Sequence, residues 1–138
     1  MYVVIVGAGR VGSALALGLI EDGHEVCFVD EDEGVLDRLG EDYPAEFVHG
    51  VGIDIGALDR AGTGRADAFV AATDGDNTNI VSAQLARDRF GVKCVISRVY
   101  DPKRARFFRE ALGIRTICPT QETIDRLAEA VRKCEVDL

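Results

Sequence analysis

The stretch VIVGAGRVGSALALGLIEDGHEVCFVD, from Val4 to Asp30, decides the fold of this protein. It begins with a run of β-branched residues and turns at three glycines spaced G-x-G-x-x-G, namely Gly7, Gly9 and Gly12. Apolar residues then recur at helical spacing, and a second apolar run ends the stretch. The pattern predicts two parallel strands joined by a helix, with a tight glycine turn after the first strand.

The remainder of the chain repeats this alternation. Strands are expected at Tyr2–Val6, Glu25–Asp30, Ala45–Val48, Ala68–Ala71, Lys93–Ser97 and Thr116–Cys118. Helices are expected at Val11–Glu21, Gly34–Leu39, Ile55–Ala61, Asn77–Arg89 and Pro102–Leu112. A helix between successive strands is typical of a parallel sheet covered on both faces. We therefore predict an α/β fold, a Rossmann-like doubly wound six-stranded parallel sheet, formed by residues 1–118.

A last helix is expected within residues 119–138, which we treat as part of the same domain. Its apolar residues recur at helical spacing, at Ile124, Leu127, Ala128 and Val131. This stripe can fold back on the helix's own sheet or dock on another copy of the chain. The pattern alone does not choose between the two.

Composition places the protein among soluble globular chains. Its 138 residues suffice for one domain with a core, and 47% of them are hydrophobic. No apolar run approaches the roughly 18 residues of a membrane-spanning helix, and the first expected strand leaves no room for a signal peptide. The net charge of -8 argues against a nucleic-acid surface. We expect a cytosolic protein that neither enters the membrane nor binds nucleic acid.

The glycine turn and the acid that ends the second strand form a candidate nucleotide site. Gly7 permits the tight turn, Gly9 lets the backbone approach a pyrophosphate, and Gly12 lets the helix pack closely on the sheet. The free N–H groups at the start of the helix would hold phosphates, and Arg10 would add positive charge. Asp30 would accept hydrogen bonds from ribose hydroxyls. The alternatives are a glycine turn without a ligand and a simple strand-end acid.

The acids after Asp30 bear on which nucleotide fits. Glu31, Asp32 and Glu33 follow it directly. A 2′-phosphate placed here would meet several like charges with no arginine to compensate them, so NADP is disfavoured. NAD, NADH, ATP, ADP and AMP all remain open as ligands.

A second group of polar residues follows the fourth and fifth expected strands. The sequence AATDGDN offers the hydroxyl of Thr73 and the polar atoms of Asp74 and Asn77 at the carboxyl edge of the sheet. It can equally be a turn and a helix cap. Arg98, at the end of the fifth strand, can contact a phosphate or carboxylate, or be an ordinary surface arginine.

The sequence contains no recognisable set of catalytic or metal-binding residues. His24 and His49 lie beside no Ser or Cys nucleophile and lack metal-site spacing. The cysteines are far apart, at Cys27, Cys94, Cys118 and Cys134. A dehydrogenase also needs a second domain for its substrate, whereas the nucleotide-binding fold uses this whole chain. We therefore expect no enzymatic activity and no bound metal.

Five segments, taken in order, carry a family resemblance. They are VIVGAGRVG; the strand end Val29–Asp30; HGVGIDIGALDRAG; AATDGDNTNI; and the set SRVYDP, LGI and ICPTQETIDRLAEAV. This series resembles the RCK N-terminal domain, also called the KTN or Trk-A N domain, and it covers nearly the whole chain. The family forms the nucleotide-binding regulatory part of Trk and Ktr potassium transporters.

The resemblance implies a cytosolic regulator that binds NAD(H) or an adenine nucleotide and gates a membrane potassium-uptake transporter. Together with the motif, it predicts nucleotide contacts at Gly7, Ala8, Gly9, Arg10, Val11, Gly12, Asp30, Glu31, Gly50, Val51, Thr73, Asp74 and Arg98. It also implies that the last helix crosses over to a neighbouring subunit, in dimers that assemble into a tetrameric or octameric ring.

Two features differ from the family pattern. Gly50-Val51-Gly52 stands where Gly-Asp-Ala is usual, which removes a carboxylate from the adenine edge and leaves the base preference open. Many members also continue into a C-terminal ligand-binding domain, so these residues form either an N-terminal domain or a minimal subunit. The alternatives to a regulator are the cofactor half of an NAD-dependent oxidoreductase and a stand-alone nucleotide or redox sensor.

Overall fold

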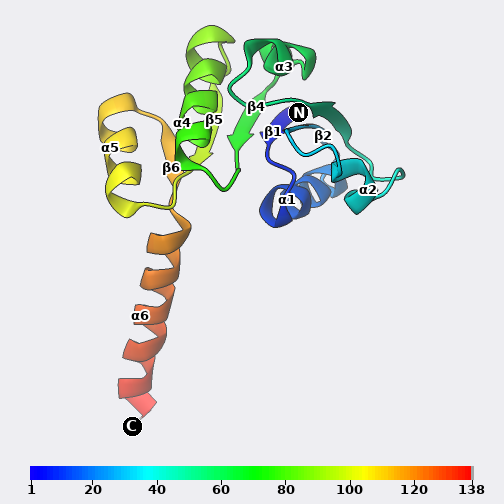
Figure 1. The fold of residues 1–138 in the computed structure, drawn as a ribbon. Coiled ribbons are helices and arrows are strands. Elements are labelled where there is room, and N and C mark those ends of the chain that lie inside the picture. The colour runs from blue at the N-terminus through cyan, green and yellow to red at the C-terminus, as the bar shows by residue number, and fades with distance from the viewer. Residues whose placement is uncertain (138) are drawn as a thin grey trace.

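Six parallel strands form the centre of the structure, a computed structural model that describes residues 1–137 (Figure 1). The strands are β1 (Tyr2–Val6), β2 (Glu25–Asp30), β3 (Glu46–His49), β4 (Ala68–Ala71), β5 (Cys94–Arg98) and β6 (Arg115–Ile117). The helices are α1 (Arg10–Glu21), α2 (Val35–Leu39), α3 (Ile55–Arg60), α4 (Asp76–Gln84), α5 (Pro102–Leu112) and α6 (Pro119–Asp137). A 3-10 turn, η1 (Thr63–Arg65), and a π-helical turn, η2 (Leu85–Arg89), complete the chain order. The predicted doubly wound α/β fold is confirmed.

The strands lie in the order β3-β2-β1-β4-β5-β6. From β1 the chain winds outward to β3, then returns to place β4 against the other side of β1. Open sheets of this kind bind ligands at the carboxyl ends of the strands where the winding reverses. In this chain that point is the gap beyond Val6 of β1 and Ala71 of β4, which are paired in register.

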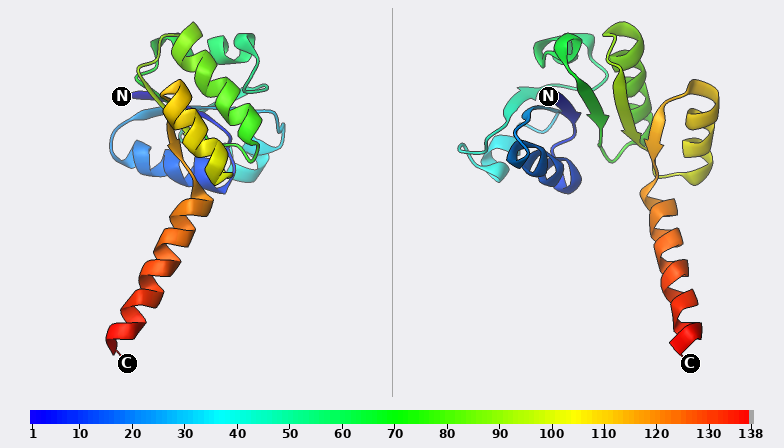
Figure 2. Two further views of the ribbon diagram at one scale, coloured as in Figure 1. Left: turned by 90° about the vertical axis from the view of Figure 1, so that its left-hand side faces the viewer. Right: turned by 180° about the vertical axis from the view of Figure 1, so that it is seen from behind.

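Helices cover both faces of the sheet, so its strands are apolar on both sides (Figure 2). On one face Ile5 shares a hydrophobic cluster with Ala16 of α1. On the other face Phe69 shares a cluster with Ala83 of α4 and Ala105 of α5. All of these side chains are fully buried, and burial of one as large as Phe69 stabilises the fold by roughly 1.5–3 kcal/mol.

Some strands and helices begin or end at other residues than predicted. For two strands, pairing with the neighbouring strand determines the last residue. β3 extends to His49 because that residue pairs with Asp30, and β5 extends to Arg98 because that residue pairs with Ile117. The helix predicted as one segment over residues 77–89 is α4 followed by the π-helical turn η2. Periodicity of apolar residues does not distinguish these two helix types, and it gave no signal for η1.

The C-terminal helix α6 does not fold back on the sheet. It leaves the body beside β6 and projects away from it as a single rod (Figures 1 and 2). Its apolar stripe is exposed, with Ile124, Leu127 and Val131 at 50%, 63% and 66% of full exposure. At its start the backbone N–H of Gln121 donates to the Cys118 sulfur at 3.4 Å. Within residues 1–137, no helix combines the length and apolar character that crossing a membrane requires.

Candidate functional site

The glycine turn between β1 and α1 is shaped by steric limits at two of its three glycines. Gly7 has φ of +105°, and a Cβ there would lie 2.7 Å from the Ala72 carbonyl oxygen. A Cβ at Gly12 would lie 1.9 Å from the Gly7 carbonyl oxygen, so α1 can approach the turn only with glycine at this position. A Cβ at Gly9 would meet no atom within 4 Å. Gly9 therefore leaves open space at the start of α1, which no side chain within residues 1–137 caps.

Asp30 ends β2 and faces this turn. Its Oδ2 accepts a hydrogen bond from the backbone N–H of Ala8 at 2.8 Å, and its Oδ1 accepts from the N–H of Asp32 at 2.8 Å. A carboxylate oxygen can accept more than one hydrogen bond, so both oxygens retain capacity for hydroxyl donors. The carboxylate is thus oriented in advance by two backbone groups.

Arg38 of α2 lines the same cavity as Asp30, a position that the sequence did not predict. Its Nη2 donates to the Ala8 carbonyl oxygen at 2.8 Å, and its Nη1 donates to Asp32 Oδ2 at 3.0 Å. The backbone N–H of Gly34 and the Arg38 guanidinium hold the pKa of Asp32 below its usual range. The sequence argument against NADP assumed that no arginine lies near the acids after β2. That assumption is wrong, because α2 places Arg38 against Asp32.

The far side of the site is organised by Asn79, a fully buried residue of α4. Its Oδ1 accepts from the Thr73 N–H at 2.9 Å and from the Thr73 hydroxyl at 2.6 Å. Its Nδ2 donates to the Thr73 and Arg98 carbonyl oxygens, both at 2.9 Å. Asn79 thereby joins the end of β4 to the end of β5. Asn77, which the sequence suggested as a polar contact, instead accepts a hydrogen bond from Arg104.

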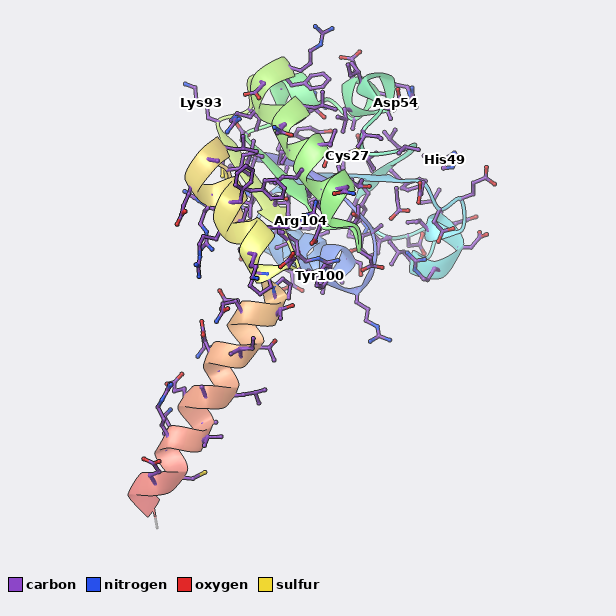
Figure 3. The ribbon with its side chains drawn as sticks, turned by 60° about the vertical axis from the view of Figure 1, so that its left-hand side comes forward. Cys27, His49, Asp54, Lys93, Tyr100 and Arg104 are labelled. Carbon is purple, nitrogen blue, oxygen red and sulfur yellow. The ribbon has the colours of Figure 1, made fainter. Side chains whose placement is uncertain are left out.

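Arg98 extends from β5 into the same region, and its side chain is 12% exposed. Its Nη2 donates to the Thr73 carbonyl oxygen at 2.8 Å and to Asp74 Oδ1 at 3.2 Å, and its guanidinium lies 4.8 Å from the ring centre of Tyr100. Among the described residues, none offers a hydrogen-bond partner to the buried Nε of Arg98. Figure 3 shows Tyr100 near Arg104 at the start of α5, with His49 on the other side of the body.

The loop from β3 to α3 forms the remaining wall. A Cβ at Gly50 would lie 2.6 Å from the Cβ of Ala57, and one at Gly52 would lie 2.4 Å from Val6 Cγ1, so both positions are tightly packed. Between them Val51 remains 41% exposed. Asp54, which accepts from the Ala57 N–H at 3.2 Å, caps α3 and holds the loop in place. The wall thus presents an apolar side chain without a hydrogen-bonding group.

These elements surround a cavity of about 720 Å³ at the carboxyl edge of the sheet. Most of the predicted site residues line it: Gly7, Gly9, Arg10, Val11, Asp30, Glu31, Val51, Thr73, Asp74 and Arg98. Three others, Ala8, Gly12 and Gly50, are outside the lining but adjoin it. Sequence reasoning missed Arg38, Thr78 and Tyr100 as lining residues, although Tyr100 lies only two positions beyond the strand-end Arg98.

The chemistry of the lining fits a phosphorylated nucleoside. One side holds a carboxylate with free acceptor capacity, Asp30, which suits sugar hydroxyls. The middle has open space at Gly9 beside an uncapped helix start, which suits phosphate. The other side holds the guanidinium of Arg98, a charged group that suits an anionic oxygen.

Relatives of this chain are found by sequence. The TrkA-N domain family matches residues 3–119. The Trk system potassium uptake protein TrkA of Streptomyces coelicolor is 44% identical over 127 residues, which are 92% of this chain and 56% of that protein. The Trk system potassium uptake protein TrkA homolog of Methanothermobacter thermautotrophicus is 35% identical over 136 residues, 99% of this chain and 62% of that protein. This chain thus spans less than two-thirds of either relative.

Solved structures share the fold at lower sequence identity. The TrkA-N domain of inner membrane protein ybaL from Escherichia coli superposes with a TM-score of 0.81 at 18% identity, covering 94% of this chain and 95% of that one. The Kef CTD of Shewanella denitrificans in its AMP-bound form superposes with a TM-score of 0.78 at 18% identity, covering 97% and 82%. Similarity at these identities establishes the fold alone.

Proposed function

This chain belongs to the TrkA-N domain family, and from this we propose that it is a nucleotide-binding regulatory domain that gates a membrane potassium-uptake transporter. One observation carries the nucleotide half of the proposal. The 2.8 Å hydrogen bond from Ala8 N–H to Asp30 Oδ2 joins the glycine turn to the strand-end carboxylate at a single cavity. The transporter half rests on the relatives, which are named as Trk system potassium uptake proteins.

The proposed ligand is an adenine nucleotide, ATP, ADP or AMP, or NAD(H). Asp30 accepts the ribose hydroxyls, the N–H groups at the start of α1 hold the phosphates, and Arg98 donates to an anionic oxygen on the far side. The AMP-bound form of the Kef domain, which has the same fold, supports an adenine-containing ligand. Val51 contacts the base through apolar surface alone, so the base is held by packing more than by hydrogen bonds to side chains.

The proposed role is regulation rather than catalysis. Among the described residues that line the cavity there is no histidine, cysteine or lysine to act as base or nucleophile. Gating requires that the nucleotide bind two arrangements of the assembly with different affinity, typically a coupling of about 1–3 kcal/mol. The cavity then works as the input of a switch.

Helix α6 is the proposed output of that switch. A helix of 19 residues with an exposed apolar face gains most of its stability from packing against another element. We propose that α6 crosses to a second copy of the chain, in dimers that assemble into a tetrameric or octameric ring. The ring would lie at the cytoplasmic face of the transporter.

Thermal unfolding with added nucleotides tests the binding proposal. A ligand at 100 times its dissociation constant stabilises the folded state by about 2.7 kcal/mol, which raises the melting temperature by several degrees. We expect this rise with NADH or an adenine nucleotide, and a much smaller one for Asp30→Ala. Asp37→Ala, which removes an exposed carboxylate of α2 outside the cavity, is the matched control. If none of NAD, NADH, ATP, ADP and AMP shifts the melting temperature, the proposal fails.

Potassium uptake tests the regulatory proposal. Membrane vesicles that contain the transporter subunit should change their uptake rate when the wild-type protein and its nucleotide are added together. Asp30→Ala should not respond to the nucleotide, while Asp37→Ala should behave as the wild type. An uptake rate that is independent of the nucleotide would rule out gating through this cavity.

A further inference from the structure

The ribose end of the cavity contains an ion pair that faces the ligand space. Asp32 and Arg38 both line the cavity, and their charged atoms are 3.0 Å apart. Arg38 also donates to the carbonyl oxygen of Ala8, the residue whose N–H donates to Asp30. Ala8 therefore links the guanidinium to the carboxylate that the proposed function assigns to the ribose hydroxyls.

Within residues 1–137, the arginine that lies next to these acids is already engaged by other groups. Asp30, Glu31 and Asp32 line this part of the cavity, and Arg38 is the cation placed among them. One of its terminal nitrogens is bonded to Asp32 and the other to a backbone carbonyl. A phosphate on the ribose 2′-oxygen would meet this excess of carboxylates and a guanidinium that is already engaged.

We propose that Asp32 excludes 2′-phosphorylated nucleotides from this site by holding Arg38 in the ion pair. The inference rests on the proposed nucleotide function and deepens it, because it names the residue pair that sets the preference for a free 2′-hydroxyl. It also replaces the reason offered by the sequence. An arginine does line this cavity, and the neighbouring carboxylate of Asp32 holds it in an ion pair.

The substitution Asp32→Asn removes the negative charge of this side chain and keeps an oxygen that can stabilise the backbone turn. Asp32 Oδ1 accepts from the Gly34 N–H at 2.8 Å, and the carbonyl oxygen of asparagine can accept the same hydrogen bond. The two charged side chains are about half exposed, and ion pairs of that kind contribute little to folding. The variant is therefore expected to fold, with Arg38 released toward the cavity.

The matched control is Glu33→Gln. It removes the same unit of charge one residue further along, from a side chain that is 86% exposed and lies outside the cavity lining. A second variant, Asp32→Asn combined with Arg38→Met, keeps the neutral residue at 32 and removes the guanidinium. It retains an unbranched apolar side chain at position 38.

Calorimetric titration with two ligand pairs tests the proposal: 5′-AMP against adenosine 2′,5′-bisphosphate, and NADH against NADPH. The wild type should prefer the member without the 2′-phosphate. In Asp32→Asn the affinity ratio should move toward the 2′-phosphorylated member by roughly tenfold, as expected for one charge-assisted hydrogen bond. Glu33→Gln should leave the ratio near that of the wild type, and the double variant should lose the gain.

Other outcomes of the titrations would overturn the proposal in one of two ways. An unchanged ratio in Asp32→Asn, an equal shift in Glu33→Gln, or a wild-type preference for the 2′-phosphate overturns the role of the ion pair while nucleotide binding stands. A wild type that binds no member of either pair overturns the proposed nucleotide function, and this inference with it.

Discussion

Replacing Asn79 by alanine would remove the side chain that joins the ends of β4 and β5 beneath the cavity. Two backbone groups would lose their best partner, the N–H of Thr73 and the carbonyl of Arg98. The Thr73 carbonyl would keep its hydrogen bond from Arg98, and the Thr73 hydroxyl would keep Gly75. The Arg98 carbonyl would keep only a long hydrogen bond from the Ser97 hydroxyl, at 3.5 Å. The change therefore weakens two backbone groups and leaves the rest of the network in place.

The size of the effect follows from these two groups. A buried backbone donor or acceptor left without a partner costs about 1–3 kcal/mol. Both groups lie in partly buried hydrogen bonds, so we expect Asn79→Ala to lower the free energy of unfolding by about 3 kcal/mol. Asn79→Asp should be worse, because a carboxylate would face the carbonyl oxygens of Thr73 and Arg98 in place of the donor Nδ2.

Urea denaturation measures the loss directly. The control is Asn77→Ala on the same helix, an exposed residue whose substitution should change the unfolding free energy by no more than about 0.5 kcal/mol. Nucleotide affinity should fall in Asn79→Ala and not in Asn77→Ala, because Thr73 and Arg98 lose their fixed positions. A loss below about 1 kcal/mol for Asn79→Ala at an unchanged m-value would refute the reasoning.

Three further predictions concern the glycine turn, the last helix and a buried phenol. Gly12→Ala should strongly lower the melting temperature, because its Cβ would lie 1.9 Å from a carbonyl oxygen, whereas Gly9→Ala should melt like the wild type and bind nucleotide more weakly. Ile124→Glu combined with Leu127→Glu should give monomers by light scattering, and persistent dimers would exclude α6 as the interface. Burial raises the pKa of Tyr2 from 10 to about 12, so stability should be complete below pH 10 and fall toward pH 12. Tyr2→Phe should flatten that fall in denaturation curves.

Local patterns were enough to predict the fold and part of the cavity lining. The turn at Gly7 and Gly12 has steric requirements that only glycine meets, so the residues themselves reveal it. Short apolar runs that alternate with helical segments predicted the ends of every strand to within one residue. Such runs are needed because the strands of a parallel sheet are buried on both faces. Asp30 was predicted as a site residue because it ends the strand after the glycine motif, and the structure places it on the cavity.

The sequence by itself determined the parallel sheet, the glycine turn and the carboxylate at the end of β2, because each depends on neighbouring residues or on a short period. Tertiary structure alone decided that Arg38 lines the cavity, that Asn79 rather than Asn77 joins β4 to β5, and that α6 stands free of its sheet. Arg38 bonds to a residue 30 positions away and Asn79 to one 19 positions away. Contacts between such distant residues produce no repeating pattern in the sequence. Their partners are set by how helices pack on the sheet, and that packing brings one buried amide and one guanidinium to the walls of a single cavity.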